Sequence, residues 1–323
     1  GSDSHESELT DHLAAAGAKV MYGQAAANIT DDIDLVVYTA AVHTDNPEYA
    51  EVVRRGIPMM TRAELLGQIM KNYGEAIAIS GTHGKTTTTS MVTEILLAAE
   101  KDPTISVGGI LHSIGGNIRV GGPELFVTEA CEYTNSFLSF FPTMEIILNI
   151  EADHLDFFKD LDDIRHSFRL FAQKLDEKGL LIINRDIKNY EEISGGLPCR
   201  VVTFGHSSES DYSAADITYD TFARPTFTLT EQGKKAGTIT LGVSGEHNVY
   251  NALAAIATAK ALGIPDAAIA EGLLHFTGTD RRFEKKGELN GITIIDDYAH
   301  HPQEIAATLK AAHNYPHKKL WCV

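Results

Sequence analysis

The sequence is poor in cysteine, in tryptophan and in long apolar runs. Its 323 residues include three cysteines, Cys131, Cys199 and Cys322, and one tryptophan. Cysteines this few and this far apart form neither a disulfide framework nor a zinc knuckle, which favours a reducing compartment such as the cytoplasm. No apolar run is long enough to span a bilayer, and no basic segment followed by an apolar one opens the chain. We therefore expect a soluble, cytoplasmic protein.

Basic side chains are also scarce. The chain has 27 lysines and arginines against 44 aspartates and glutamates, a formal net charge of -17. Such a field repels polyanions, so we expect no nucleic-acid partner and no anionic membrane surface. Any phosphate ligand must be held by a local site. The hydrophobic content of 43% and the length predict a globular protein of two or three domains.

The order of predicted helices and strands indicates an α/β protein in three parts. Residues 1–73 read as a small α/β layer, and residues 74–279 as a doubly wound parallel sheet that carries a threonine-rich antiparallel extension over residues 200–241. Residues 280–323 begin a third part with strands and a helix. The oligomeric state is not predicted.

Both ends are expected to lie inside domains. Asp3 and Glu6 have the spacing of a capping box, so a helix is predicted directly after the start, with no strand before it. Residues 320–323, LWCV, read as a buried strand. We therefore expect the first and third parts to be partial domains. The alternative explanation for the start is that Gly1-Ser2 is a cloning remnant.

The clearest motif is GTHGKT, residues 81–86. An apolar strand over residues 75–79 precedes it, and a helix with apolar spacing follows from Lys85. This is the context of a phosphate loop, although Ile79 stands where the full pattern has its first glycine. Gly81 and Gly84 would let backbone N–H groups converge on a polyphosphate at the helix start. Lys85 would reach the terminal phosphates and Thr86 would ligate magnesium. The alternative is a glycine turn that caps a threonine-rich helix.

Acidic residues follow two further predicted strands. Glu129 and Glu132 come after the strand at residues 125–128, and Asp153 and His154 after the strand at residues 145–150. Strand ends of a parallel sheet meet at one edge, where oxygen ligands and one imidazole suit magnesium shared with nucleotide phosphates. We expect Glu129 and His154 to be metal or water ligands. Solvated loop carboxylates are the alternative.

Two other motifs carry candidate ligand groups. Asn248 and Asn251 lie three residues apart at the start of a long predicted helix, where their amides could read an adenine base or simply cap the helix. Arg281 and Arg282 follow at the next boundary, as a phosphoryl clamp or as ordinary surface arginines.

The stretch IIDDYAHHPQEI places several polar side chains in one loop between a strand and a helix. Asp297 could hold a substrate ammonium group, and His300 could orient it or accept its proton. Zinc binding by His300 and His301 is the discounted alternative, because adjacent histidines rarely point at one ion.

Together these motifs resemble the Mur ligase family. They are GTHGKTTTT, EACEYTNSF, NIEADHLDFFKD, GEHNVYNALAA, GTDRRFE and DDYAHHP, in the family's order along nearly the whole chain. The resemblance implies three domains, with Rossmann-like outer ones: one for a UDP-sugar, a central ATPase and one for an amino acid. It also implies ATP-dependent amide formation between UDP-N-acetylmuramate and L-alanine through an acyl phosphate, with ATP and Mg²⁺, in peptidoglycan precursor synthesis.

The resemblance assigns roles to the candidate residues. Lys85, Glu129, His154, Asp297 and His300 would be catalytic, and Thr86, Glu129 and His154 would bind the metal. Ser2, Asp3 and Tyr298 would face the substrates. The residues expected to bind ATP are Gly81, Thr82, His83, Gly84, Lys85, Thr86, Thr87, Asn248, Asn251 and Arg282.

The chain departs from the family pattern in places. Cys131 and Thr134 stand where the family often has aspartates, which leaves Glu132 as an alternative to Glu129, and the glycine-rich UDP turn is not in the sequence. A ligase that recycles intact peptides shares nearly all the motifs, and a P-loop kinase or ATPase is a further reading. A nucleotide-binding fragment that binds ATP without turnover is the expectation for these residues alone.

Overall fold

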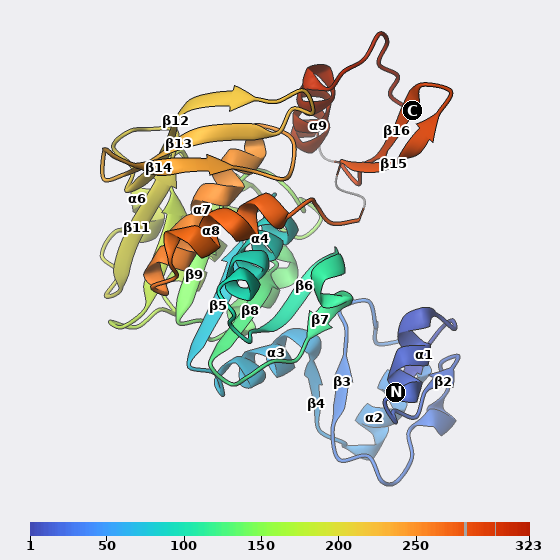
Figure 1. Ribbon diagram of the computed structural model, residues 1–323. Helices are drawn as coiled ribbons and strands as arrows, with labels where there is room; N and C mark the ends of the chain where they lie inside the picture. The colour runs from blue at the N-terminus through green and yellow to red at the C-terminus, as the bar shows by residue number, and fades with distance from the viewer. Residues whose placement is uncertain (281–282, 301) are drawn as a thin grey trace. The chain divides into compact units, whose positions relative to one another are not determined.

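The chain folds into two compact units. The computed structural model describes residues 1–280, 283–300 and 302–323 (Figure 1). One unit comprises Gly1–Ile69 and the other Met70–Val323. No helix among these described residues is long and apolar enough to cross a membrane.

The first unit consists of short helices and two pairs of parallel strands. β1 pairs with β2, and β3 pairs with β4. Helix α2 begins after Asn46, whose side chain accepts from the backbone N–H groups of Glu48 and Tyr49, and it ends at the left-handed Gly56. The elements of the first unit are β1 (Ser2–Asp3), α1 (Glu8–Ala15), β2 (Met21–Tyr22), η1 (Ala26–Asn28), β3 (Val36–Tyr38), α2 (Pro47–Arg55) and β4 (Met59–Thr61), with α3 (Arg62–Met70) at the boundary between the units.

The prediction for the start of the chain was wrong. A strand, β1, does precede α1, and the helix is capped by a reciprocal pair between Ser7 and Thr10 rather than by Asp3 and Glu6. Asp3 instead accepts from the N–H of His5 at 3.2 Å, two residues on. An aspartate bonded in this local way forms a turn and leaves the helix start to another residue.

The second unit is built on a ten-stranded sheet in the order β14-β13-β12-β11-β10-β9-β5-β8-β6-β7. The strands from β12 to β6 run parallel, which confirms the doubly wound pattern. The antiparallel extension predicted over residues 200–241 is made by β12–β14, whereas residues 200–205 form β11, which is parallel to β10. The strands are β5 (Glu75–Ser80), β6 (Thr104–Leu111), β7 (Gly116–Arg119), β8 (Leu125–Ala130), β9 (Met144–Ile147), β10 (Leu180–Asn184), β11 (Arg200–Gly205), β12 (Tyr212–Tyr219), β13 (Pro225–Glu231) and β14 (Lys234–Thr240).

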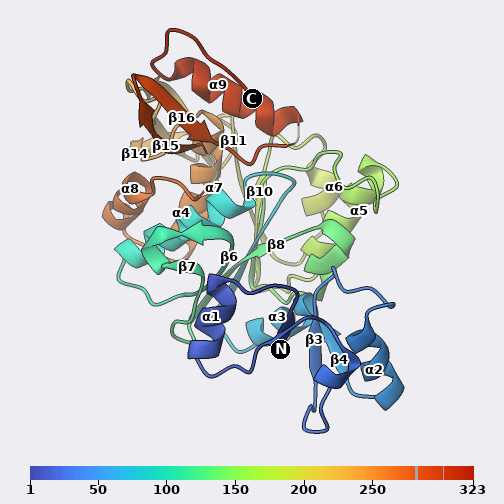
Figure 2. The same ribbon diagram turned by 90° about the vertical axis from the view of Figure 1, so that its right-hand side faces the viewer.

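Helices cover both faces of this sheet. Figure 2 shows α4, α7 and α8 on one side and α5 and α6 on the other. Helix α7 is rich in alanine, and its small, fully buried Ala254 and Ala255 let it pack between the strands and α4. The elements are α4 (Lys85–Ala98), α5 (Leu161–Ala172), α6 (Glu191–Ser194), α7 (His247–Ala261) and α8 (Asp266–His275), with the 3₁₀ segments η2 (His112–Ile114) and η3 (Tyr133–Ser139).

Two strands of the sheet, β6 and β7, have no counterpart in the sequence analysis. β6 inserts between β8 and the edge strand β7, and its residues Gly108 and Gly109 interrupt the apolar alternation that marks a strand. This strand matters for function because it runs beside the phosphate loop.

The third part of the chain forms a hairpin of β15 (Glu284–Leu289) and β16 (Ile292–Asp296), followed by α9 (Pro302–Asn314). The predicted buried strand at residues 320–323 was wrong, because these residues form no strand and Trp321 is 81% exposed. A strand needs a neighbour for its hydrogen bonds, and β15 and β16 pair with each other.

Candidate active site

The GTHGKT stretch lies between β5 and α4, as predicted. Gly81 and Gly84 have φ angles of 140° and 83°, which suit glycine rather than residues with a side chain. A Cβ on Gly84 would also lie 2.5 Å from Oδ1 of Asn251. Both glycines are therefore required by the path of the backbone and by its close packing.

The start of α4 presents unpaired donors. Within the described residues, the backbone N–H groups of residues 84–87 donate to no protein acceptor, whereas the N–H of Thr88 donates to the carbonyl of Gly84 at 2.9 Å. These donors and the helix dipole, about half a positive charge, favour an anion at this point. A protein with a strongly negative net charge can bind a polyphosphate here because the attraction is local.

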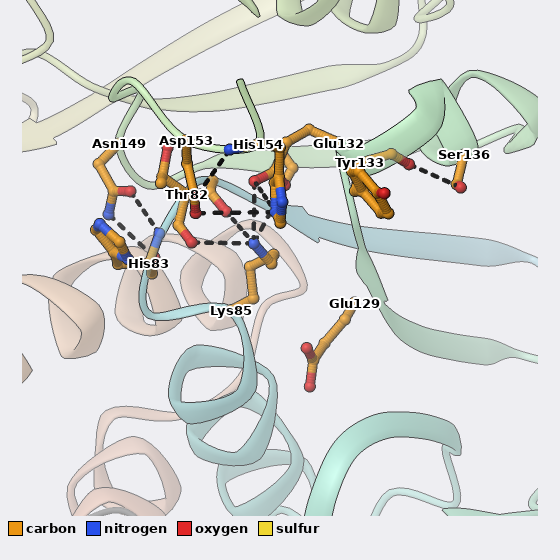
Figure 3. Close-up of polar contacts among 12 residues, drawn as sticks. Thr82, His83, Lys85, Glu129, Glu132, Tyr133, Ser136, Asn149, Asp153 and His154 are labelled. Carbon is orange, nitrogen blue, oxygen red and sulfur yellow. Dashed lines mark hydrogen bonds and ion pairs between the residues drawn. The ribbon is translucent and has the colours of Figure 1, made fainter. Parts of the chain in front are cut away.

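Lys85 lies at the centre of the site, where it holds a buried carboxylate. Its Nζ donates to the carbonyl oxygen of Gly81, to that of Thr82 at 3.1 Å and to Oε2 of Glu132 at 3.1 Å (Figure 3). Glu132 is only 2% exposed. A buried carboxylate needs such a partner, since an isolated charge is costly to desolvate.

The acidic residues that follow the strands make contacts with different partners. Glu129 accepts from the Thr86 hydroxyl at 3.1 Å and from the N–H of Gly108. His154 has its Nε2 3.9 Å from Oε1 of Glu132. The imidazole also lies 3.8 Å from Oδ2 of Asp153, and its ring packs on that of Tyr133 with centroids 4.6 Å apart. Of the two glutamates, the one recorded near it is Glu132, in the turn that follows β8.

The residues present fit a shared magnesium ion. Among the described residues, no group of three or more His, Cys, Asp or Glu side chains could hold a metal alone. Thr86, Glu129, Glu132 and His154 nevertheless offer hard oxygen ligands and one imidazole around the phosphate loop. Magnesium commonly takes one or two carboxylates and completes its shell with water and phosphate oxygens.

Two cavities adjoin the loop. The smaller one, of about 180 Å³, is lined by residues 82–87 together with Asp153, His154 and His300. The larger one, of about 420 Å³, extends from the loop past the carboxyl ends of β9, β10 and β11 to α7. Its lining includes His83, Gly84, Thr87, Leu148, Asn149, Glu151, Asn184, Asp186, Phe204, His206, His247, Asn248, Tyr250, Asn251, Phe283 and Asp297.

The asparagines of α7 line the larger cavity in a fixed arrangement. Nδ2 of Asn251 donates to Oδ1 of Asn248 at 3.0 Å, and Nδ2 of Asn248 donates to the carbonyl of Ser244 at 2.8 Å. Nearby, the rings of His206 and Tyr250 stack with centroids 3.7 Å apart. Burial and the neighbouring carboxylate of Glu246 raise the pKa of Tyr250 to about 12, so its hydroxyl stays neutral. An oriented amide pair beside an aromatic wall suits a heterocyclic base.

The DDYAHH motif is divided between the two cavities. Asp297 lines the larger one and accepts from the N–H groups of Phe283 at 2.8 Å and Ala299 at 2.7 Å. His300 lines the smaller one, beside the phosphate loop. Tyr298 is 51% exposed, with its ring 5.3 Å from that of His300. Asp297 and His300 thus line adjoining cavities, and their joint handling of one amine stays a prediction.

The remaining candidates are placed as follows. In the first unit, the Ser2 hydroxyl donates to Oε2 of Glu48 at 2.6 Å, and Asp3 ends β1. Arg281, Arg282 and His301 lie outside the described residues, so their predicted roles stay predictions.

Sequence reasoning missed several residues that the fold brings to the site. Asn149 and Glu151 follow β9 and bond to the phosphate loop, while Asp186 and His206 follow β10 and β11. Asn149 opens the quoted NIEADH stretch, but the strand predicted at residues 145–150 included it, whereas β9 ends at Ile147. The contact of Asn149 with the phosphate loop could not be predicted, because a side chain that bonds to the backbone of a remote loop leaves no local sequence pattern.

Comparison with known families identifies all three parts of the chain. Models described as "Mur ligase family, catalytic domain", "Mur ligase middle domain" and "Mur ligase, glutamate ligase domain" match residues 1–74, 79–259 and 281–323. The chain is 64% identical to a UDP-N-acetylmuramate–L-alanine ligase of Lachnospira eligens, over 100% of this chain and 71% of that protein.

Solved structures show the same similarity. The UDP-N-acetylmuramate–alanine ligase of Thermotoga maritima superposes with a TM-score of 0.83 at 33% identity, over 97% of this chain and 71% of that one. A murein peptide ligase of Psychrobacter arcticus superposes with a TM-score of 0.80 at 28% identity, over 97% and 70% of the two chains.

Proposed function

The chain belongs to the Mur ligase family, and from this premise we propose that it joins L-alanine to UDP-N-acetylmuramate in an ATP-dependent reaction. The observation that carries the proposal is the pairing of the phosphate-loop Lys85 with Glu132 beside His154. It supports phosphoryl transfer at this edge of the sheet. Similarity along the whole chain to UDP-N-acetylmuramate–L-alanine ligases supports the two substrates. The reaction would be a step of peptidoglycan precursor synthesis.

The two cavities suggest how ATP is held. The open N–H groups of residues 84–87 and the ammonium group of Lys85 would bind the phosphates in the smaller cavity. The base would lie in the larger cavity against Asn248 and Asn251, and Asp297 there would accept from a hydroxyl of the nucleotide's sugar. Thr86, Glu129, Glu132 and His154 would hold Mg²⁺, which when bound offsets the negative charge of the phosphates.

The remaining roles follow the proposed reaction. A carboxylate oxygen of the sugar bonds to the γ-phosphorus as ADP leaves; the amine nitrogen then bonds to the acyl carbon as phosphate leaves and a proton passes to a base. His300 is the candidate base, since it lines the cavity beside the loop. Ser2 and Asp3, in the proposed UDP-sugar domain at residues 1–73, would bind the UDP-sugar. Tyr298, in the proposed amino-acid domain at residues 280–323, would bind the amino acid, and residues 74–279 would bind ATP.

Product analysis tests this proposal. We expect phosphate release only when ATP, Mg²⁺, UDP-N-acetylmuramate and L-alanine are all present, with the alanyl amide identified by mass spectrometry. Phosphate release from ATP alone would indicate an ATPase, and a peptide accepted in place of alanine would indicate a recycling ligase. ATP binding by calorimetry without any turnover would indicate a nucleotide-binding fragment.

A further inference from the structure

The turn that follows β9 is bonded to the phosphate loop by one side chain, Asn149. The N–H of His83 donates to Oδ1 of Asn149 at 2.7 Å, and Nδ2 of Asn149 donates to the carbonyl oxygen of His83 at 3.0 Å. Figure 3 shows both bonds. One carboxamide thus binds the donor and the acceptor of a single residue, as a neighbouring β-strand would.

Backbone contacts reinforce this pairing. The N–H of Thr82 donates to the carbonyl of Asn149 at 3.2 Å, and the Thr82 hydroxyl accepts from the N–H of Glu151 at 2.9 Å. The loop and the turn also pack tightly, since a Cβ on Gly81 would lie 3.0 Å from Cβ of Leu148. The N–H groups of Thr82 and His83 are therefore occupied, and the donors left for a phosphate are those of residues 84–87.

The carbonyl contact has a consequence for the next residue. The peptide bond between His83 and Gly84 is trans, so its C=O and N–H point in opposite directions. When Asn149 holds the carbonyl of His83, the N–H of Gly84 must point away from Asn149, on the side where residues 82–87 line the smaller cavity. Gly84 has φ 83° and no side chain, so its own conformational preference does not fix the orientation of this peptide.

We propose that Asn149 is a positioning residue that locks the His83–Gly84 peptide with its N–H toward the nucleotide phosphates. If that peptide rotated, it would present a carbonyl oxygen to the phosphates, and like partial charges would repel. Because Asn149 holds the loop in its binding conformation before the ligand arrives, a polyphosphate can bind without the cost of ordering the loop. The inference rests on the proposed function, because it assumes that ATP phosphates occupy the smaller cavity.

Equilibrium binding of ATP, ADP and adenosine to the full chain separates the possibilities. For Asn149→Ala we expect the Kd for ATP and ADP to rise about tenfold, while the Kd for adenosine stays within about twofold. Asn149→Asp keeps an acceptor for the N–H of His83, loses the donor and adds a charge, so it should weaken ATP binding at least as much. Steady-state rates should show a higher KM for ATP with an unchanged KM for the UDP-sugar.

A matched substitution provides the control. Asn117 lies half-buried in the edge strand β7, and Asn117→Ala should leave the Kd values of all three ligands unchanged. Equal weakening of ATP and adenosine by Asn149→Ala, or no weakening of ATP, would overturn the inference. Failure of the unmodified chain to bind ATP would instead count against the proposed function.

Discussion

Two buried glutamates in neighbouring parts of one sheet have opposite surroundings. Glu132, in the turn after β8, is 2% exposed and accepts from Lys85 at 3.1 Å, with His154 close by. Glu145, the second residue of β9, is fully buried, and neither of its carboxylate oxygens has a hydrogen-bond partner among the described residues. Burial raises the pKa of Glu145 well above its usual value, against the opposing effect of the positive charge of Lys174.

The difference shows that burial alone does not mark a functional carboxylate. Glu132 lies where the strands end, 3.1 Å from the ammonium group of Lys85 and beside the phosphate loop, where a carboxylate can act on a ligand. Glu145 lies between strands among apolar side chains, where the neutral acid is the stable form. We propose that Glu132 takes part in the chemistry, whereas Glu145 is expected to lower stability as pH rises.

Removal of Lys85 should have the largest effect, because it leaves Glu132 buried without its cation. We expect Lys85→Ala to lower turnover by more than about 100-fold and the free energy of unfolding by about 3 kcal/mol. Product formation and urea unfolding would measure the two effects. Lys101→Ala, just beyond α4, is the matched control, and near-normal turnover in Lys85→Ala would refute the proposed role.

A second pair of variants separates the two acidic strand-end residues. Because Glu132 contacts both Lys85 and His154, we expect Glu132→Gln to lower kcat about 100-fold and to raise the Mg²⁺ concentration needed for half-maximal rate. Glu129→Gln should lower kcat about tenfold and raise the same Mg²⁺ concentration. Magnesium titrations of the rate would measure this. A larger effect of Glu129→Gln would restore Glu129 as the principal metal ligand.

Glu145→Gln tests the other half of the comparison. The folded-state pKa of Glu145 is raised, so its contribution to stability is greatest below the unfolded pKa of about 4.5 and is lost as pH rises toward the folded pKa. The glutamine variant lacks this titration and should unfold roughly 2–4 °C higher at pH 8, with little difference near pH 4.5. Thermal unfolding across pH would show it; equal midpoints at every pH would mean that Glu145 is not held neutral.

The ion pairs of Glu51 with Arg54 and Arg55 on α2 should give the smallest effect. Hydrogen bonds from Arg54 and Arg55 lower the pKa of Glu51 to about 2. The Arg54 side chain is 68% exposed, so salt and water screen much of the attraction, and Glu51→Gln should move the unfolding midpoint by less than about 1 °C. Scans at low and high salt would check this, and a shift comparable to that of Lys85→Ala would show that the first unit depends on this pair.

Some features could be predicted from the sequence because their signals are local. The phosphate loop was placed by an apolar strand before it and a helical period after it. Helix periodicity, caps and turns depend on residues a few positions apart, so one segment carries the whole signal. The family resemblance rests on the same kind of short motif.

Which of these side chains meet was decided only by the tertiary structure. Lys85 contacts Glu132, 47 positions away, and His83 contacts Asn149, 66 positions away, because β8 and β9 flank β5 in the sheet. The insertion of β6, the division of Asp297 from His300 and the isolation of Glu145 likewise follow from packing. Strand order and loop conformation are set by the sum of many long-range contacts, and no single stretch of sequence records that sum.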